Sequence, residues 1–141
     1  MPQTGDKISI LGFGCMRFPL DAEGKIDEPR SAAMLHSAID RGVNYIDTAY
    51  PYHGGESEPV VGRALEGGYR EKVFLATKLP SWMVETPSDM DRLLDEQLKK
   101  LRTDHIDYYL LHSLNADRWG IMKRNDYGKF LERALADGRI R

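Results

Sequence analysis

Residues 42–52 read Gly-Val-Asn-Tyr-Ile-Asp-Thr-Ala-Tyr-Pro-Tyr. Within this stretch a short apolar run ends at the acidic residue Asp47, and a loop with two tyrosines follows. Runs of this length that are rich in β-branched and aromatic residues, and bounded by Gly or polar residues, predict strands. Three other runs share these properties, so we predict strands over residues 8–14, 43–47, 73–78 and 106–112.

The segments between these runs carry apolar residues at helical spacing. One-sided stripes fall within residues 34–39, 60–65, 90–101 and 127–135. Glycines follow the first, second and fourth stripes where a helix C-cap belongs, and Thr86-Pro87 precedes the third as a cap and first helical residue. A one-sided stripe is typical of a helix that lies on a sheet. Strands that alternate with such helices predict right-handed βαβ units and a parallel sheet.

The period of this alternation distinguishes two parallel folds. Asp47 and Lys78 end strands 31 residues apart, and His112 ends the next strand 34 residues later. Eight such units would total ~250 residues, the usual size of a closed (β/α)8 barrel. A doubly wound nucleotide-binding fold needs G-x-G-x-x-G, and residues 12–17 have Arg in place of the third glycine. We therefore predict an α/β protein of the (β/α)8 TIM-barrel type, with only the first four β/α units in residues 1–141.

The composition excludes several classes of protein. Twenty Lys and Arg residues against 22 Asp and Glu give a net charge of −2, which favours neither nucleic acid nor an anionic membrane as partner. The single cysteine, Cys15, allows no intrachain disulfide and no CxxC metal cluster. The sequence contains neither a signal peptide nor a membrane-spanning apolar run. We expect a soluble, cytoplasmic protein without a metal site.

Ionisable residues stand at the ends of three consecutive predicted strands: Asp47, Lys78 and His112. In a barrel the C-terminal strand ends converge on one rim, where active sites lie. Each residue has a simpler interpretation by itself, since Asp47 could cap a turn, Lys78 could extend to solvent and His112 could be a core histidine. Their common register favours a shared site, because a desolvated charge is costly without a partner. The loop after Asp47 adds Tyr50 and Tyr52 as candidates.

These motifs resemble those of the aldo-keto reductase family. The run from Asp47 to Tyr52, Asp-Thr-Ala-Tyr-Pro-Tyr, is similar to the family pattern of a strand ending in Asp-Thr-Ala and a Tyr five residues after the Asp. The resemblance extends to Ala-Thr-Lys78, to Leu-Leu-His112 and to the opening segment, residues 11–17. It selects Tyr52 over the other tyrosine of the loop. It also implies that residues 1–141 are the N-terminal half of an aldo-keto reductase barrel.

The resemblance implies hydride transfer from NADPH to the carbonyl carbon of a small substrate, with Asp47, Tyr52, Lys78 and His112 as catalytic residues. The residue chemistry agrees, because a phenol keeps its proton at neutral pH until a developing alkoxide needs it. The Lys78 ammonium would favour the phenolate, and Asp47 would pair with that ammonium. His112 would donate a hydrogen bond to the carbonyl oxygen.

Contacts to cofactor and substrate are also implied. The resemblance puts Met16, Arg17 and Asp47 near the nicotinamide ribose, although Arg17 could equally be a surface cation. Trp82 and Trp119 follow the third and fourth strands, and each could line a substrate pocket or pack against its own loop. The family holds the adenosine phosphate with later loops, after strands five to eight.

Two other functions remain open. A non-catalytic relative of the same fold would bind the cofactor and act as a regulatory subunit. The other is an enzyme of a different barrel class that binds a phosphate group, which would need a Gly-rich phosphate loop late in the barrel. A four-stranded piece leaves parallel edges unpaired. Either the remaining strands belong to a longer native chain, which we favour, or two halves self-associate through these barrel edges. We also expect the 141-residue chain to show no reductase activity alone.

Overall fold

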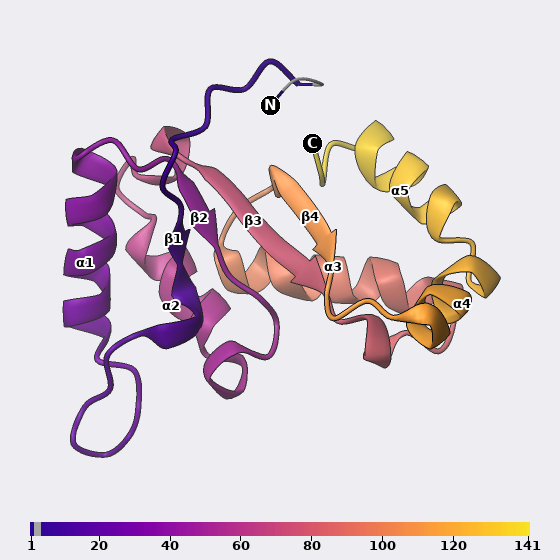
Figure 1. Cartoon of the computed structure of the whole chain (residues 1–141), viewed down its shortest axis with the longest axis horizontal. Coiled ribbons are helices and arrows are strands. Elements are labelled where there is room, and N and C mark those ends of the chain that lie inside the picture. Colours follow the sequence, from indigo (N-terminus) through magenta and orange to yellow (C-terminus); the bar gives the residue numbers. More distant parts are fainter. Residues whose placement is uncertain (2–3) are drawn as a thin grey trace.

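The structure is a computed structural model that describes residue 1 and residues 4–141, and it contains one parallel sheet and its connecting helices (Figure 1). The strands are β1 (Phe13–Gly14), β2 (Tyr45–Asp47), β3 (Phe74–Leu79) and β4 (Tyr108–Leu111). The α-helices are α1 (Glu28–Asp40), α2 (Ser57–Ala64), α3 (Pro87–Leu101), α4 (Ala116–Arg124) and α5 (Tyr127–Ala136). Short 3-10 helices are η1 (Cys15–Arg17), η2 (Tyr52–Gly55), η3 (Arg70–Lys72) and η4 (Ser81–Met83).

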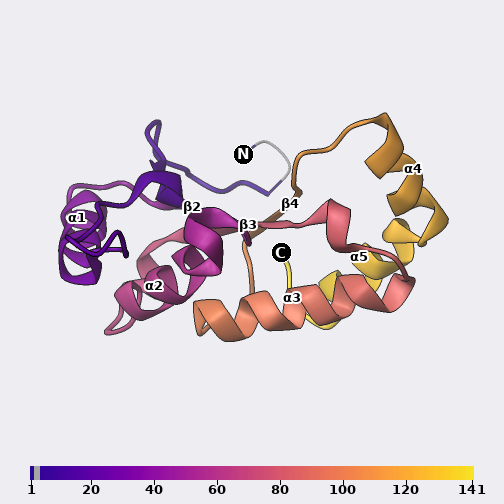
Figure 2. The ribbon, with the colours of Figure 1, turned by 90° about the horizontal axis from the view of Figure 1, so that it is seen from below.

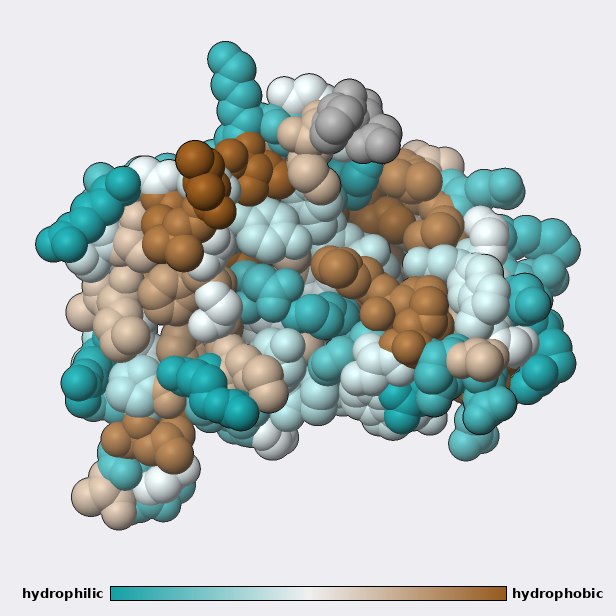
Figure 3. Space-filling model, in the orientation of Figure 1, coloured by the Kyte–Doolittle hydropathy of each residue, from teal (hydrophilic) through white to brown (hydrophobic). Residues whose placement is uncertain are grey.

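The strands follow the order β1-β2-β3-β4, and every neighbouring pair is parallel. This confirms the predicted parallel sheet, in which each strand pairs with the next one along the chain. Figure 2 shows α1, α2 and α3 on one side of the sheet. The other face is seen in Figure 3, where apolar residues gather over the segment before β1 and beside β4. Exposed residues of these segments include Ile10, Leu11 and Leu110.

The core lies between the sheet and the helices that cover it. Alternate strand residues such as Ile46 and Leu75 are fully buried against the helices, as the two-residue period of a strand requires. Helix α3 begins with the predicted cap, because Thr86 forms a capping box with Asp89. Gly62 lets α2 approach α3, since a Cβ there would stand 2.5 Å from a backbone oxygen of α3. Burial of the α3 stripe anchors the longest helix to β3 and β4.

The first strand is shorter than predicted. Of residues 8–14, only Phe13 and Gly14 form a strand. Upstream, the Ser9 amide donates to Asn44 Oδ1 at 2.7 Å, and the Asn44 amide donates to Ser9 Oγ at 3.0 Å. Hydrogen bonds of these side chains thus replace the backbone ladder in this part. The Ile10 side chain is fully exposed, so the apolar run does not form a buried strand.

The fourth β/α unit contains a helix that the apolar pattern did not predict. Helix α4 begins after Asn115, whose side chain accepts from the Arg118 amide. Met122 is its one fully buried residue, so its sequence lacks the stripe that marks the other helices. Among the described residues, no helix is both long and apolar enough to cross a membrane.

After α5 the backbone returns to the sheet. Ile140 forms a parallel bridge with Ile106, just before β4. The Ile106 amide donates to Arg139 O at 2.9 Å, and the Arg141 amide donates to Ile106 O at 3.0 Å. The last residues therefore occupy the position of a fifth parallel strand beside β4.

Candidate active site at the C-terminal ends of the strands

Strand alternation directs three ionisable side chains to the same face of the sheet. Asp47 is the register partner of Ala76, and Lys78 is the partner of Leu110. Ile46 and Leu75 lie toward the helices, so Asp47 and Lys78 lie on the opposite face, because the Asp47 partner Ala76 comes two residues before Lys78. His112 follows the Lys78 partner Leu110 by two residues. This common face holds the predicted site, at the end where the strand arrows point in Figure 1.

The acid and the amine predicted to meet form a close ion pair. Lys78 Nζ lies 2.6 Å from Asp47 Oδ1 and also donates to the backbone oxygen of Thr48 at 2.6 Å. The Lys78 side chain is only 14% exposed, and that of Asp47 is 30% exposed. The carboxylate supplies the counter-charge that a partly buried ammonium needs. The pair fixes the position of the ammonium in the site.

Tyr52 and Tyr50 point to different parts of the molecule. The Lys78 ammonium lies 4.9 Å from the centroid of the Tyr52 ring, whereas the Tyr50 hydroxyl donates to Glu96 of α3 at 3.1 Å. Lys100 lies over the Tyr50 ring at 3.8 Å. Tyr50 therefore joins the loop to α3, and Tyr52 is the tyrosine that the structure brings to Lys78.

His112 completes the group. Its ring meets that of Tyr52 edge to face, with centroids 5.8 Å apart. Its Nδ1 atom is buried without a hydrogen-bond partner in the part of the chain that the structure describes. Burial lowers the pKa of His112 below its ordinary value, and the nearby Lys78 charge lowers it further. The imidazole is therefore neutral at pH 7 and can donate a hydrogen bond from one nitrogen.

His53, which follows Tyr52 directly, has a role that the sequence pattern did not reveal. It adopts φ 53° and ψ 42°, a left-handed conformation that is uncommon for a residue with a side chain. Its Nε2 accepts from the Phe18 amide at 3.0 Å, and its ring stacks on Phe18 with centroids 5.8 Å apart. These contacts tie the Tyr52 loop to the segment that follows β1, and they offset the backbone strain.

A buried polar network supports the strand that carries Lys78. Thr77 Oγ1 and Gln97 Nε2 donate to Glu58 Oε1 at 2.7 and 2.6 Å. Gln97 also donates to the backbone oxygen of Lys78 at 3.1 Å and accepts from the Tyr109 hydroxyl at 2.7 Å. Burial raises the pKa of Glu58, although these hydrogen bonds oppose the shift. The network joins α2, α3, β3 and β4 directly beneath the site.

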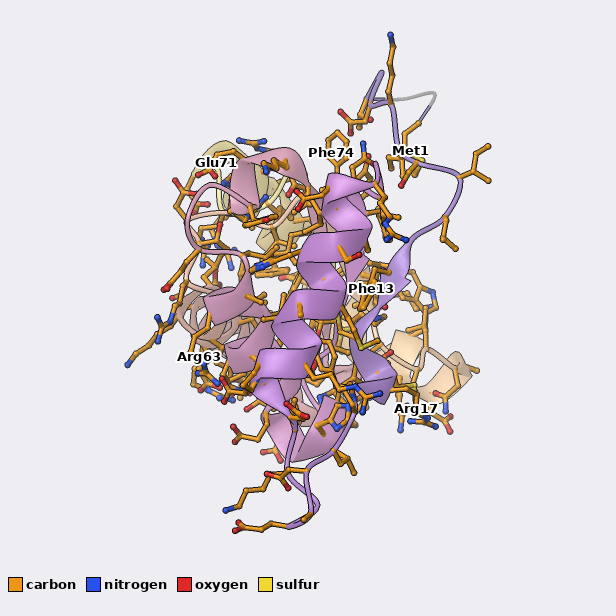
Figure 4. The ribbon with its side chains drawn as sticks, turned by 90° about the vertical axis from the view of Figure 1, so that its left-hand side faces the viewer. Met1, Phe13, Arg17, Arg63, Glu71 and Phe74 are labelled. Carbon is orange, nitrogen blue, oxygen red and sulfur yellow. The ribbon has the colours of Figure 1, made fainter. Side chains whose placement is uncertain are left out.

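The residues predicted to hold the cofactor lie beside this group. Gly14 is the register partner of Asp47, so Met16 and Arg17 come immediately after the β1 end that adjoins it. Both side chains are exposed. Figure 4 shows Arg17 at this end of the molecule, opposite the end with Glu71 and Phe74. The side chains are therefore free to meet a ligand that approaches the rim.

Cys15 lies beneath this segment. It is fully buried, and burial raises the pKa of its thiol, which disfavours the thiolate. Its backbone oxygen accepts from Ser57 Oγ at 3.0 Å. This agrees with a small apolar residue that fills the core.

The two tryptophans lie in different surroundings. The Trp82 ring lies 5.2 Å from the His112 ring, so the structure brings it to the site. Trp119 instead meets Tyr127 at 6.4 Å, at the junction of α4 and α5. Contact of either residue with substrate stays a prediction, and the geometry favours Trp82.

Comparison with known proteins identifies this arrangement. The model of the aldo/keto reductase family matches residues 10–141. Methylglyoxal reductase YeaE of Escherichia coli (strain K12) is 37% identical over 140 residues, which are 98% of this chain and 45% of that protein. Aldo-keto reductase YhdN of Bacillus subtilis (strain 168) is 37% identical over 117 residues, which are 77% of this chain and 35% of that protein.

A solved structure matches as well. The aldo/keto reductase from Klebsiella pneumoniae in complex with NADP and acetate superposes with a TM-score of 0.74 and 30% identity, over 94% of this chain and 44% of that one. The match of these β/α units to part of a reductase barrel confirms the predicted TIM-barrel type of fold. The chain belongs to the aldo/keto reductase family. It spans about half the length, or less, of these relatives.

Proposed function

We propose that this chain carries the proton-donating part of an NADPH-dependent reductase that converts an aldehyde or ketone to an alcohol. The observation that carries the proposal is the contact of the Lys78 ammonium with Asp47 on one side and with the Tyr52 ring on the other. His112 stands at the edge of the same Tyr52 ring. A phenol beside a cation and a neutral imidazole is a suitable pair for protonating and polarising a carbonyl oxygen.

In the proposed reaction Tyr52 is the general acid. Its hydroxyl proton passes to the carbonyl oxygen, and the Lys78 ammonium stabilises the phenolate that remains. Asp47 holds that ammonium in place through the 2.6 Å ion pair. His112 donates a hydrogen bond to the same oxygen and orients the carbonyl. The nicotinamide cofactor, when bound, supplies the hydride to the carbonyl carbon.

The residues beside the tetrad fit such a cofactor. Asp47 keeps a second carboxylate oxygen for a ribose hydroxyl, since Oδ1 is the atom that pairs with Lys78. Exposed Met16 and Arg17 would flank the nicotinamide half. The NADP complex of the Klebsiella pneumoniae relative supports the choice of cofactor. The adenosine half has no assigned residue in this chain.

The length of the chain bears on activity. We propose that residues 1–141 form the N-terminal half of the reductase barrel, with β1 to β4 and the start of a fifth strand. The site then needs the other half for a closed barrel and for the adenosine phosphate. We expect the isolated monomeric chain to show no NADPH-dependent turnover. Cytoplasmic location and self-association through the barrel edges stay predictions.

The main alternative is a cofactor-binding regulatory subunit of the same fold. Stopped-flow measurement of NADPH oxidation by several aldehydes distinguishes the two. The protein measured would be a single polypeptide that joins this chain to the C-terminal half of a reductase barrel. A reductase turns over repeatedly, because the acid is regenerated from solvent after each cycle. A single slow turnover followed by retained oxidised cofactor would favour the regulatory alternative.

A further inference from the structure

A second cation lies at the same rim, beyond His112. Arg118, in the first turn of α4, holds its guanidinium carbon 5.3 Å from the centroid of the Trp82 ring. The Trp82 ring in turn lies 5.2 Å from the His112 ring. These three side chains therefore form a continuous series of contacts that begins at His112. We call it the Arg118 wall.

The Arg118 guanidinium is held in place but not neutralised. Its Nη1 donates to the backbone oxygen of Ser113 at 2.7 Å, and stacking on Trp82 restricts the rest of the group. Among the described residues it forms no ion pair with a carboxylate, in contrast to Lys78, whose charge is matched by Asp47. A guanidinium has five N–H donors, so most of them remain for a ligand.

The chemistry of these donors defines the ligand. A planar guanidinium presents parallel N–H groups that match the two oxygens of a carboxylate. The aromatic surface of Trp82 suits an apolar body between the carboxylate and the reacting carbon. The charge also acts at His112, because Arg118 contributes to lowering the pKa of that imidazole.

We propose that Arg118 is a specificity residue that selects carbonyl substrates bearing a carboxylate, with the carbonyl at Tyr52 and His112 and the carboxylate at the guanidinium. The part that concerns the carbonyl rests on the proposed reductase function. The carboxylate site rests only on the Arg118 wall, so it can be tested by binding without turnover.

The binding test uses benzoate and its neutral isostere benzamide with the 141-residue chain. The Trp119→Phe background leaves Trp82 as the single tryptophan, so its indole N–H signal in a ¹H–¹⁵N spectrum reports on the wall. We expect benzoate to bind roughly tenfold more tightly than benzamide, a difference of about 1.4 kcal/mol. Arg118→Gln should reduce this preference to less than about twofold, with benzamide binding retained.

Two further variants make the result specific. Arg118→Lys keeps the charge but loses the paired donors, so it should retain an intermediate preference. Arg124→Gln, at the exposed other end of α4, is the matched control and should bind as the parent does. Equal binding of benzoate and benzamide by the parent, or an unchanged preference in Arg118→Gln, would overturn the proposal.

A kinetic arm keeps the two proposals separate. With an active enzyme, Arg118→Gln should lower kcat/KM for a benzaldehyde with a para carboxylate, relative to benzaldehyde, by roughly tenfold. If turnover survives Tyr52→Phe while this ratio still depends on Arg118, the reductase mechanism fails and the carboxylate site stands. If Tyr52 is essential and the ratio does not change, only the carboxylate site is refuted.

Discussion

The two ends of the sheet both gather charged residues, yet they differ in how completely those residues are paired. At the N-terminal end, Arg70 donates to Asp107 at 2.7 Å, to Thr103 at 3.0 Å and to the backbone oxygens of Val73 and His105 at 3.1 and 3.0 Å. Asp107 also accepts from the Leu75 amide at 2.9 Å. Both Arg70 and Asp107 thus have partners within the chain.

The C-terminal rim is incompletely paired. Among the described residues, His112 Nδ1 is buried without a hydrogen-bond partner, and Arg118 forms no ion pair with a carboxylate. His53 adopts a strained backbone conformation next to Tyr52. Unmet polar groups and local strain are typical of sites that receive a ligand.

Cavity volume, in contrast to pairing, would favour the N-terminal end of the sheet as a ligand site. A cavity of about 670 Å³ opens at the N-terminal end, beside Arg70 and Asp107. Arg70 and Asp107 already satisfy one another there, so a ligand for them would have to break those contacts. Whether charged side chains have partners within the chain therefore distinguishes a structural cluster from a reactive one better than cavity volume does.

The largest effect on stability is expected at the paired end. Arg70→Leu removes the main partner of a carboxylate that is only 5% exposed. Of its described partners, Asp107 keeps only the Leu75 amide and the more distant Arg141 and His105. Removing its closest cation should lower the free energy of unfolding by about 3 kcal/mol. Urea denaturation of the 141-residue chain measures this loss.

The matched control is Arg63→Gln, which removes a two-pronged contact with Glu28 on the surface. Because the Arg63 side chain is 37% exposed and that of Glu28 49% exposed, the expected loss is less than about 1 kcal/mol. Equal losses in the two variants would show that the contrast between the paired cluster and ordinary surface pairs is false.

A smaller effect is expected at the rim, from His53. His53→Ala removes the acceptor for the Phe18 amide and keeps the left-handed strain, whereas His53→Gly removes both. The Gly variant should therefore be more stable than the Ala variant by about 1 kcal/mol. Hydrogen exchange of the Phe18 amide should accelerate in both variants.

This pair of substitutions separates the strain from the contact. If the Ala and Gly variants are equally stable, the backbone at His53 is not strained. If Phe18 exchange stays slow in both variants, the imidazole does not tie the two loops together.

Much of the fold was predictable because it depends on local periodicity. The apolar stripes of α3 and α5 and the end of β2 at Asp47 are read directly from the sequence. The end of β3 is predicted to within one residue, since the strand extends to Leu79. Strand alternation then requires Asp47 and Lys78 to share a face, which is why their pairing could be foreseen.

Other features depend on contacts that no pattern encodes. The length of β1 is set by the exchange of hydrogen bonds between Ser9 and Asn44, and α4 forms with little apolar burial. The Arg118 wall arises only when η4 and α4 meet beyond His112. The left-handed His53 could have been suspected from its place before two glycines, but its contact with Phe18 could not.

The central claim is that Tyr52, rather than Tyr50, delivers the proton at the rim. Single-turnover hydride transfer from NADPH to an aldehyde, measured for Tyr52→Phe and Tyr50→Phe in a complete barrel, tests it most directly. We predict that Tyr52→Phe slows the transfer by about a thousandfold while cofactor binding persists. Tyr50→Phe should remain within about tenfold of the parent, because its hydroxyl contacts Glu96 instead. Undiminished transfer in Tyr52→Phe would contradict the account.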